Sequence, residues 1–391
     1  MFRGFTFSLF LALAGALLIA GCGDAEGLVD AQDPAVEEEE QSPPEPEQRL
    51  LNPALRGALP VGSLEEAGPR LPASQSEDEE PAESCDPEQS PDCEPTAPLG
   101  PPYPVVLAHG FFGFDSFAGI DFITYFYRVL DYLAEAGEHD IFITTVDPFN
   151  DSVARGSQLL AQVEDIVTAT SYEKINLIGH SQGGLDSRYV AHHRPDLVAS
   201  VTTFATPHRG TAVADIALRM MSHDRTQEVV DAIVQLAGAP LWDTVDEETS
   251  LAASLRQLST EGAAEFNAVH TDSPEVTYFS LTGRSGMHTG WPQCSVGERP
   301  DFIRKYDGYL DPVDPMLLVT QQILAAPFNL RPNDGLVRVE DAYWGRFLGC
   351  VPADHLDEIG HLFGTIPGLL NFWRHGLFYV ELVEFLRDEG F

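Results

Sequence analysis

The sequence predicts an α/β fold, built on a mainly parallel β-sheet with helices on both faces. Two observations predict it. From residue 103 onward, short apolar segments typical of strands alternate with segments typical of helices, and such alternation favours a parallel sheet with crossover helices. In addition, the pentapeptide at residues 179–183, which contains Ser181, joins a predicted strand directly to a predicted helix.

The predicted elements follow one another in a simple order, without an internal repeat. The expected strands occupy residues 103–108, 140–145, 174–178, 198–205 and 276–282. The expected helices occupy residues 122–136, 153–170, 185–193, 262–269 and 372–387.

Length and composition limit the class of protein. The chain has 391 residues, of which 43% are hydrophobic, enough for one large α/β domain with a sizeable core. Its formal net charge of −39 argues against a nucleic-acid partner, because nucleic acids attract basic surfaces. Acidic residues are concentrated between residues 24 and 100, although the rest of the chain is acidic too.

Residues 1–22 are typical of an export signal. Arg3 supplies the positive n-region and residues 5–20 the apolar h-region. The segment ends in LIAGC at Cys22, which resembles the lipobox of bacterial lipoproteins, where the cysteine is diacylated and becomes the mature N-terminus. Gly23, rather than an aspartate, follows it, which in lipoproteins implies sorting to the outer membrane. The alternative is an ordinary secretory signal and a secreted protein. No later apolar run is long enough to span a bilayer.

Residues 23–102 form a low-complexity segment rich in Glu, Asp and Pro. A segment with high charge and few aromatic side chains cannot bury enough apolar surface to fold. We therefore expect a disordered spacer between a lipid anchor and a folded domain at residues 103–391.

The cysteine count agrees with export into an oxidising compartment. Without Cys22, the five cysteines leave an even set of four, as expected for disulfides outside the cytoplasm. Cys85 and Cys93 are close neighbours and are expected to close a small loop in the spacer, and Cys294 and Cys350 then pair by default. The alternative is free thiols.

The pentapeptide GHSQG at residues 179–183 fits the pattern G-x-S-x-G. A strand before it and a helix after it form the context of a nucleophile elbow, a strained turn that lifts the serine hydroxyl above the sheet. The flanking glycines leave room for the backbone to approach. Ser181 is therefore the expected nucleophile, the alternative being a structural Gly-rich turn.

A serine nucleophile needs an oxyanion hole, a base and an acid. The loop HGFFG at residues 109–113 follows the first strand, so we expect the backbone N–H groups of Phe111 and Gln182 to bind the oxyanion. In the α/β-hydrolase fold the acid and then the histidine follow the nucleophile. Residue pattern alone leaves several candidates open, namely His208, His270, His288, His355, His361 and His375, and Asp311, Asp314, Asp334, Asp341, Asp354 and Asp357.

Several segments spread over most of residues 103–386 are informative together: YPVVLAHG (103–110), NLIGHSQGG (176–184), RPDLVAS (194–200), ATPHRG (205–210), EGAAEFN (261–267), LDP (310–312), NDGLV (333–337) and HLDE (355–358). In sequence and in order, they resemble segments of the bacterial true lipases of the Pseudomonas and Burkholderia type, which are triacylglycerol lipases with an α/β-hydrolase fold. The resemblance implies Ser181 as nucleophile, Asp334 as the acid that orients the base, and His355 as the base.

The resemblance also implies a structural calcium site, because family members bind Ca²⁺ near the catalytic histidine. The matching positions are the side chains of Asp311 and Asp357 and the backbone carbonyls of His361 and Thr365. Calcium prefers hard oxygen ligands, and carboxylates supply the charge. The alternative is that both aspartates are plain surface carboxylates. His361 departs from the residue expected there, but a carbonyl ligand tolerates the change.

The resemblance further implies a helical lid, which matches residues 220–242. Val229, Val230, Ile233, Val234 and Ala237 fall on one helical face, either as a mobile apolar cover or as part of a core helix. Phe111, Phe112, Phe114 and Phe117 would line an acyl cleft or belong to the core. The family's disulfide implies the pair Cys294–Cys350, although Cys350 lies nearer to His355 than the family pattern predicts.

We expect a lipid-anchored triacylglycerol lipase that acts on an ester substrate at an interface. One alternative, with the same catalytic chemistry, is a short-chain esterase or polyester depolymerase on the same scaffold. The other is a non-catalytic surface lipoprotein that binds lipid. Many relatives need a membrane-bound foldase, so a foldase is a possible partner of this chain too.

Overall fold

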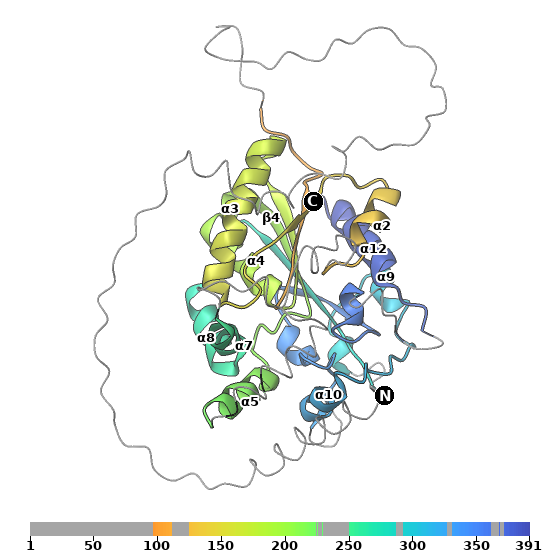
Figure 1. Ribbon diagram of the computed structural model, residues 1–391. Helices are drawn as coiled ribbons and strands as arrows, with labels where there is room; N and C mark the ends of the chain where they lie inside the picture. Colours follow the sequence, from red (N-terminus) through yellow and green to blue (C-terminus); the bar gives the residue numbers. More distant parts are fainter. Residues whose placement is uncertain are drawn as a thin grey trace, which may run out of the picture. The chain divides into compact units, whose positions relative to one another are not determined.

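A six-stranded sheet forms the centre of the computed structural model, with the strand order β2-β1-β3-β4-β5-β6 and every neighbouring pair parallel (Figure 1). The structure describes residues 97–111, 125–223, 225, 229, 250–286, 292–326, 331–360, 367 and 371–391. The strands are β1 (Val105–Ala108), β2 (Ile141–Thr144), β3 (Ile175–His180), β4 (Val198–Phe204), β5 (Thr277–Gly283) and β6 (Arg346–Val351).

The α/β fold with a parallel sheet is confirmed, and five strands lie where they were expected. The sixth, β6, was not predicted. Its sequence, RFLGCV, begins with an exposed arginine and contains Gly349 at φ 126°, so it lacks the uninterrupted apolar run that marks the others. It follows β5 at the edge of the sheet.

Helices flank the sheet along its length. They are α2 (Val129–Glu135), α3 (Ser152–Thr170), α4 (Gln182–His193), α5 (Ala212–Met221), α7 (Leu251–Leu258), α8 (Thr260–Val269), α9 (Asp301–Arg304), α10 (Leu318–Ala325) and α12 (His375–Asp388). Short 3₁₀ helices are η4 (Pro195–Leu197), η5 (Pro292–Cys294), η6 (Val339–Ala342) and η7 (Asp357–Ile359).

The helix expected at residues 122–136 is shorter in the structure and begins at Val129. Arg128, the residue before the helix, adopts φ 55°. Residues 125–128 therefore form a non-helical turn. Tyr125 and Phe126 are buried instead in the core and beside the elbow, which explains why an apolar pattern extended beyond the helix itself. Helices α5, α7, α9 and α10 were not predicted.

Alternating residues of the sheet pack into two cores. Val105 and Leu107 of β1 join the cluster that contains α2 and α12, whereas Val106 joins the cluster that contains α3. Helices α2 and α12 accordingly lie on one face of the sheet and α3 lies on the other (Figure 1). Each fully buried aliphatic side chain contributes about 1.5–3 kcal/mol, so both faces hold the sheet in place.

Helix α3 is positioned by its cap and its buried face. The Asp151 side chain accepts hydrogen bonds from the backbone N–H groups of Val153 and Ala154 at 3.0 and 2.9 Å, which satisfies donors that the first turn leaves unpaired. Leu159, Val163 and Ile166 face the sheet. Arg155 lies on the same buried side of the helix.

Several expectations fall wholly or largely outside the described residues. These are the export signal with Cys22, most of the spacer with Cys85 and Cys93, and most of the lid region, of which residues 220–223, 225 and 229 are described. Ahead of the expected domain start, Leu99 donates its N–H to Ser171 O at 2.8 Å. Cys294 and Cys350 form the expected disulfide between η5 and β6, with Cα atoms 5.2 Å apart. Among the helices described, none is long and apolar enough to cross a membrane.

Candidate active site

Ser181 lies at the turn between β3 and α4, the strand–turn–helix context that the sequence predicts. Its backbone has φ 55° and ψ −127°, and a non-glycine residue in such a conformation stores about 1–3 kcal/mol of strain. The flanking glycines permit close packing: a Cβ on Gly179 would lie 2.4 Å from Gly183 O, and one on Gly183 would lie 2.2 Å from Ala108 O. The turn therefore requires both glycines and places the buried Ser181 at the end of the strand.

The predicted acid and base are brought together. His355 Nδ1 lies 2.8 Å from Asp334 Oδ2, and both side chains are buried. Asp334 Oδ1 accepts hydrogen bonds from the N–H groups of Leu336 and Val337 at 2.8 and 2.7 Å. Backbone N–H groups of its own turn thus hold the Asp334 carboxylate in place. In this position, the carboxylate orients the His355 imidazole.

His355 also lies beside the elbow. Its ring centroid is 4.6 Å from that of His180, the residue immediately before Ser181. Three loops that are far apart in the sequence, at the ends of β3 and β6 and before η6, therefore supply the three expected triad residues.

The other candidate histidines that are described have different partners. His208 contacts Thr203 and stacks on Trp344, His270 contacts Phe266 O, and His375 contacts Tyr127 O. His288 and His361 lie outside the described residues.

The loop that follows β1 is held by its own histidine. His109 Nε2 accepts a hydrogen bond from Val146 N–H at 3.0 Å, and its Nδ1 lies 2.9 Å from Gly110 O. Burial, and secondarily the charge of Arg155, lower the pKa of His109 to about 3. The ring is therefore neutral, with Nδ1–H as the donor to the Gly110 carbonyl.

Arg155 holds the same loop from the other side. Its Nη2 donates to His109 O at 2.8 Å and to Gly110 O at 3.3 Å, and its Nε donates to Asp186 Oδ2 of α4 at 2.9 Å. Sequence reasoning missed this residue. The available signal was a charged side chain four residues before Leu159 and eight before Val163, on the apolar face of α3.

The two expected oxyanion donors lie at defined places. Gln182 is the first residue of α4, and the first N–H groups of a helix have no acceptor within it. Phe111 follows the loop held by His109 and Arg155, and its ring lies edge-on to Phe149 at 5.4 Å.

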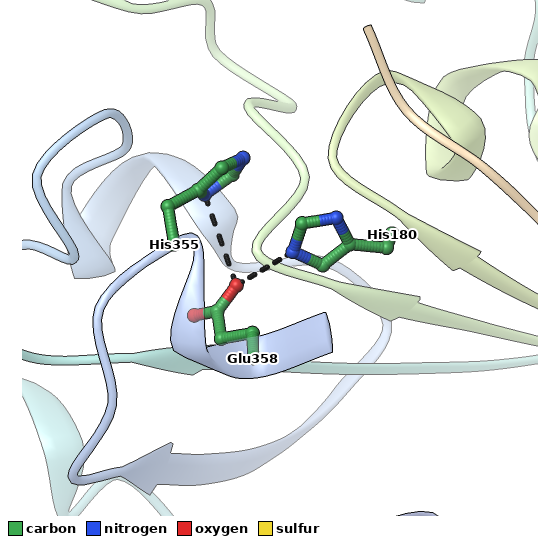
Figure 2. Close-up of side chains that lie close together, drawn as sticks. All are labelled: His180, His355 and Glu358. Atoms are coloured by element: carbon green, nitrogen blue, oxygen red, sulfur yellow. Dashed lines mark hydrogen bonds and ion pairs between the residues drawn. The ribbon is translucent and has the colours of Figure 1, made fainter. Parts of the chain in front are cut away.

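His355 also belongs to a second buried cluster, with His180 and Glu358 (Figure 2). Glu358 Oε2 lies 2.7 Å from His180 Nε2 and 3.7 Å from His355 Nδ1. His180 Nδ1 lies 2.7 Å from the Tyr125 hydroxyl. Burial and the nearby charge of Asp334 raise the pKa of Glu358 well above its ordinary value. Sequence reasoning assigned no role to Tyr125, His180 or Glu358.

Three buried carboxylates gather near the base. One oxygen from each of Asp311, Asp354 and Asp357 lies within 4.8 Å of the others. Both carboxyl oxygens of Asp311 lack a hydrogen-bond partner among the described residues. Burial, and then the charges of Asp354 and Asp357, raise the pKa of Asp311 to about 9. Such a group needs a proton or a cation.

The structure therefore brings together the two aspartates expected to bind calcium. Asp354, which the sequence analysis considered only as a candidate catalytic acid, lies with them. Its side chain accepts hydrogen bonds from the N–H groups of Leu356 and Asp357, both at 3.0 Å. His361 and Thr365 lie outside the described residues. The donor set is all oxygen and negatively charged, which suits a hard divalent cation such as Ca²⁺.

A serine at a strand-to-helix turn above a parallel sheet, with an Asp–His pair following it in the chain, is the arrangement of the α/β-hydrolase serine hydrolases. Residues 103–284 match the family model described as the alpha/beta hydrolase fold. A triacylglycerol lipase of Vibrio cholerae is 35% identical over 297 residues, which cover 74% of this chain and 86% of that protein. One from Burkholderia plantarii is 40% identical, over 67% of this chain and 80% of that protein.

Among solved structures, the Staphylococcus hyicus lipase has a TM-score of 0.50 at 17% identity and covers 76% of this chain and 97% of that chain. This likeness supports the fold alone. The sequence matches go further: the chain belongs to the α/β-hydrolase family and, within it, to the family of these bacterial triacylglycerol lipases. It is a serine ester hydrolase.

Proposed function

We propose that the protein is a triacylglycerol lipase whose triad is Ser181, His355 and Asp334. The observation that carries the proposal is the elbow serine beside a buried histidine whose Nδ1 is 2.8 Å from a fixed aspartate. The relatives from Vibrio cholerae and Burkholderia plantarii that cover most of the chain are named triacylglycerol lipases, which supports the substrate class.

In the proposed reaction, the Ser181 hydroxyl attacks the ester carbonyl while His355 accepts its proton. Asp334 holds the imidazole in the tautomer with Nδ1–H and stabilises the imidazolium. The backbone N–H groups of Phe111 and Gln182 bind the oxyanion. His355 then gives the proton to the leaving alcohol, and a water that it activates hydrolyses the acyl-enzyme and releases the fatty acid.

We further propose that Asp311 and Asp357 hold a structural calcium ion, with the carbonyls of His361 and Thr365. The support is the buried carboxylate cluster, in which Asp311 has no hydrogen-bond partner among the described residues. When bound, the ion would neutralise repulsion between these groups. Because Asp357 is two residues from His355, the ion would fix the loop that carries the base.

The proposed location is the outer membrane, reached through the export signal and a lipid on Cys22, with residues 23–102 as the spacer. A Cys22→Ser variant should then lose its association with membranes and keep its activity. Retained membrane association would indicate another anchor, whereas a wild-type chain found only in the secreted fraction would favour an ordinary secretory signal. Dependence on a foldase is tested by refolding the purified chain alone.

The substrate proposal is tested by hydrolysis of emulsified triglycerides from tributyrin to triolein, with and without Ca²⁺. Activity that persists or rises on long chains supports the lipase. Activity confined to tributyrin and soluble esters would favour a short-chain esterase or polyester depolymerase with the same triad.

The nucleophile is tested by Ser181→Ala, with Ser157→Ala as the matched control at an exposed position of α3. We expect loss of turnover and of fluorophosphonate labelling in the first variant only, by about 10⁶-fold in turnover. Labelling of the Ser181→Ala variant would overturn the assignment. A wild-type chain that neither turns over esters nor reacts with the probe would leave a non-catalytic lipid-binding protein.

A further inference from the structure

Tyr125 reaches the point where the oxyanion loop meets the elbow. A Cβ on Gly110 would lie 2.6 Å from the Tyr125 hydroxyl and 2.6 Å from the Ser181 Cβ. The hydroxyl is thus packed against Gly110 in the loop that precedes Phe111. Its own ring is buried and contacts Phe126 edge-on at 5.1 Å.

From this hydroxyl, polar contacts continue to the base. The Tyr125 hydroxyl is 2.7 Å from His180 Nδ1, and His180 Nε2 is 2.7 Å from Glu358 Oε2. If the hydroxyl donates to Nδ1, then Nε2–H donates to Glu358. Figure 2 shows Glu358 between the two histidines, and the same Oε2 atom is 3.7 Å from His355 Nδ1.

We propose that Tyr125, His180 and Glu358 form one buried hydrogen-bonded chain that holds the oxyanion loop and the catalytic base in register. Tyr125 and Glu358 are then positioning residues, which act through Gly110 and His355 rather than on the substrate. The inference rests on the proposed function of Ser181, His355 and Asp334, and it adds the device that keeps them aligned.

Burial makes this arrangement costly unless every member is paired. His180 and Glu358 are fully buried, and Tyr125 is 5% exposed. A buried polar group without a hydrogen-bond partner destabilises the fold, because its lost hydration is not replaced. A network in which every group is hydrogen-bonded is rigid. A phenylalanine and an aliphatic side chain would fill the same space without this penalty, so the polar residues point to positioning rather than to packing.

The test is a double-mutant cycle with Tyr125→Phe and Glu358→Ala in the full chain, measured on p-nitrophenyl butyrate. We expect each change to lower kcat roughly 10-fold or more with little change in KM, since a misplacement of about 1 Å can cost on the order of 10² in rate. The kcat of the double variant should be little lower than that of either single variant, because each single substitution already disrupts the same hydrogen-bonded network.

Two further variants separate positioning from general loss of structure. Glu358→Gln keeps an oxygen that accepts from His180, so it should recover most of the activity that Glu358→Ala loses. Tyr379→Phe is the matched control: this tyrosine is equally buried, but its hydroxyl has no hydrogen-bond partner among the described residues. It should retain wild-type kcat. Melting curves in Ca²⁺ confirm that each variant is folded.

Hydrogen exchange gives a readout that does not depend on turnover. Glu358→Ala should speed amide exchange in the peptide that contains Gly110, which lies at the Tyr125 end of the hydrogen-bonded network. Glu358→Gln should leave this exchange unchanged. Unchanged exchange there, additive losses in kcat, or wild-type kcat in Tyr125→Phe would each overturn the proposal. A wild-type protein that hydrolyses no ester would instead overturn the proposed function. Hydrogen exchange would still decide whether the hydrogen-bonded network couples the oxyanion loop to the loop that carries His355.

Discussion

Asp334 and His355 are joined twice, once through their side chains and once through their backbones. The carboxylate oxygen Oδ2 is 2.8 Å from His355 Nδ1, and His355 N–H donates to the Asp334 carbonyl at 2.9 Å. The backbone contact sets the separation of two loops that are 21 residues apart, and the side-chain contact sets the ring. The acid and the base therefore form one unit, held independently of Ser181.

Replacing Asp334 with Asn tests this unit. The amide oxygen can still accept from Leu336 and Val337, so the turn should persist, but the NH₂ group cannot accept from His355 Nδ1–H. We expect kcat to fall by about 10²–10⁴, the usual contribution of general acid–base catalysis, while the melting temperature changes little. Wild-type kcat in Asp334→Asn would contradict the role of this aspartate.

Replacing Arg155 with Lys tests the support of the oxyanion loop. Lysine keeps the charge but lacks the planar fork that contacts His109 O and Asp186 together. We expect kcat to fall by about 10²-fold with KM nearly unchanged, because the loop shifts. Urea unfolding should show a loss of about 1–3 kcal/mol, because buried carbonyls that Arg155 contacts lose a hydrogen-bond donor.

The matched control for that variant is Arg128→Lys, whose ion pair with Asp131 is more than half exposed and should contribute little. Equal kcat in Arg155→Lys and Arg128→Lys would show that the loop does not depend on the guanidinium.

His208 predicts how stability depends on pH. Burial, and then the charges of Arg188 and Arg209, lower the pKa of this histidine well below 6.5. Below about pH 6.5, His208 therefore binds a proton in the unfolded chain but stays neutral in the folded chain. The stability due to His208 is complete above that pH and is lost as the pH falls.

We expect the free energy of unfolding of His208→Gln to fall less steeply below pH 6.5, by up to about 1.4 kcal/mol per pH unit relative to the wild type. Glutamine can keep a hydrogen bond to Thr203 without titrating. His193→Gln, at an exposed position of α4, should retain the wild-type slope. Urea unfolding from pH 7 to pH 5 measures all three, and equal slopes for the wild type and His208→Gln would refute the assignment.

Local sequence patterns were sufficient to predict the parts of the site that are local. Residue pattern left the acid and the base open, and only the resemblance to bacterial lipases selected Asp334 and His355, but the elbow at Ser181 is a continuous strand–turn–helix. The strands with uninterrupted apolar runs were predicted for the same reason. Strand β6 was missed because Arg346 and Gly349 interrupt its pattern.

The supporting residues depend on contacts between distant segments, which no local pattern encodes. Arg155 is 46 residues from His109, and Tyr125 is 55 residues from His180. Each looks like an ordinary surface or core residue until the sheet brings the partners together. Asp354 joins the other carboxylates in the same way, since the loop after β6 has to meet Asp311 from an earlier loop.

Calcium removal tests the carboxylate cluster through stability as well as activity. If Asp311 and Asp357 bind the ion, it stabilises the folded chain only, by about 2.7 kcal/mol at 100 times its Kd. We expect the melting temperature to fall by about 5–10 °C when a chelator replaces Ca²⁺. Asp311→Asn should melt at nearly the same temperature in both conditions, because it has lost a charged ligand.

Two comparisons make this result specific. Asp301→Asn replaces an aspartate whose side chain is 87% exposed, and it should keep the full response to Ca²⁺. Mg²⁺ should restore less stability than Ca²⁺, because it demands a tighter octahedral site and dehydrates reluctantly. An identical melting curve of the wild type in Ca²⁺ and in chelator would exclude the ion, and the buried Asp311 would then have to be held by a proton.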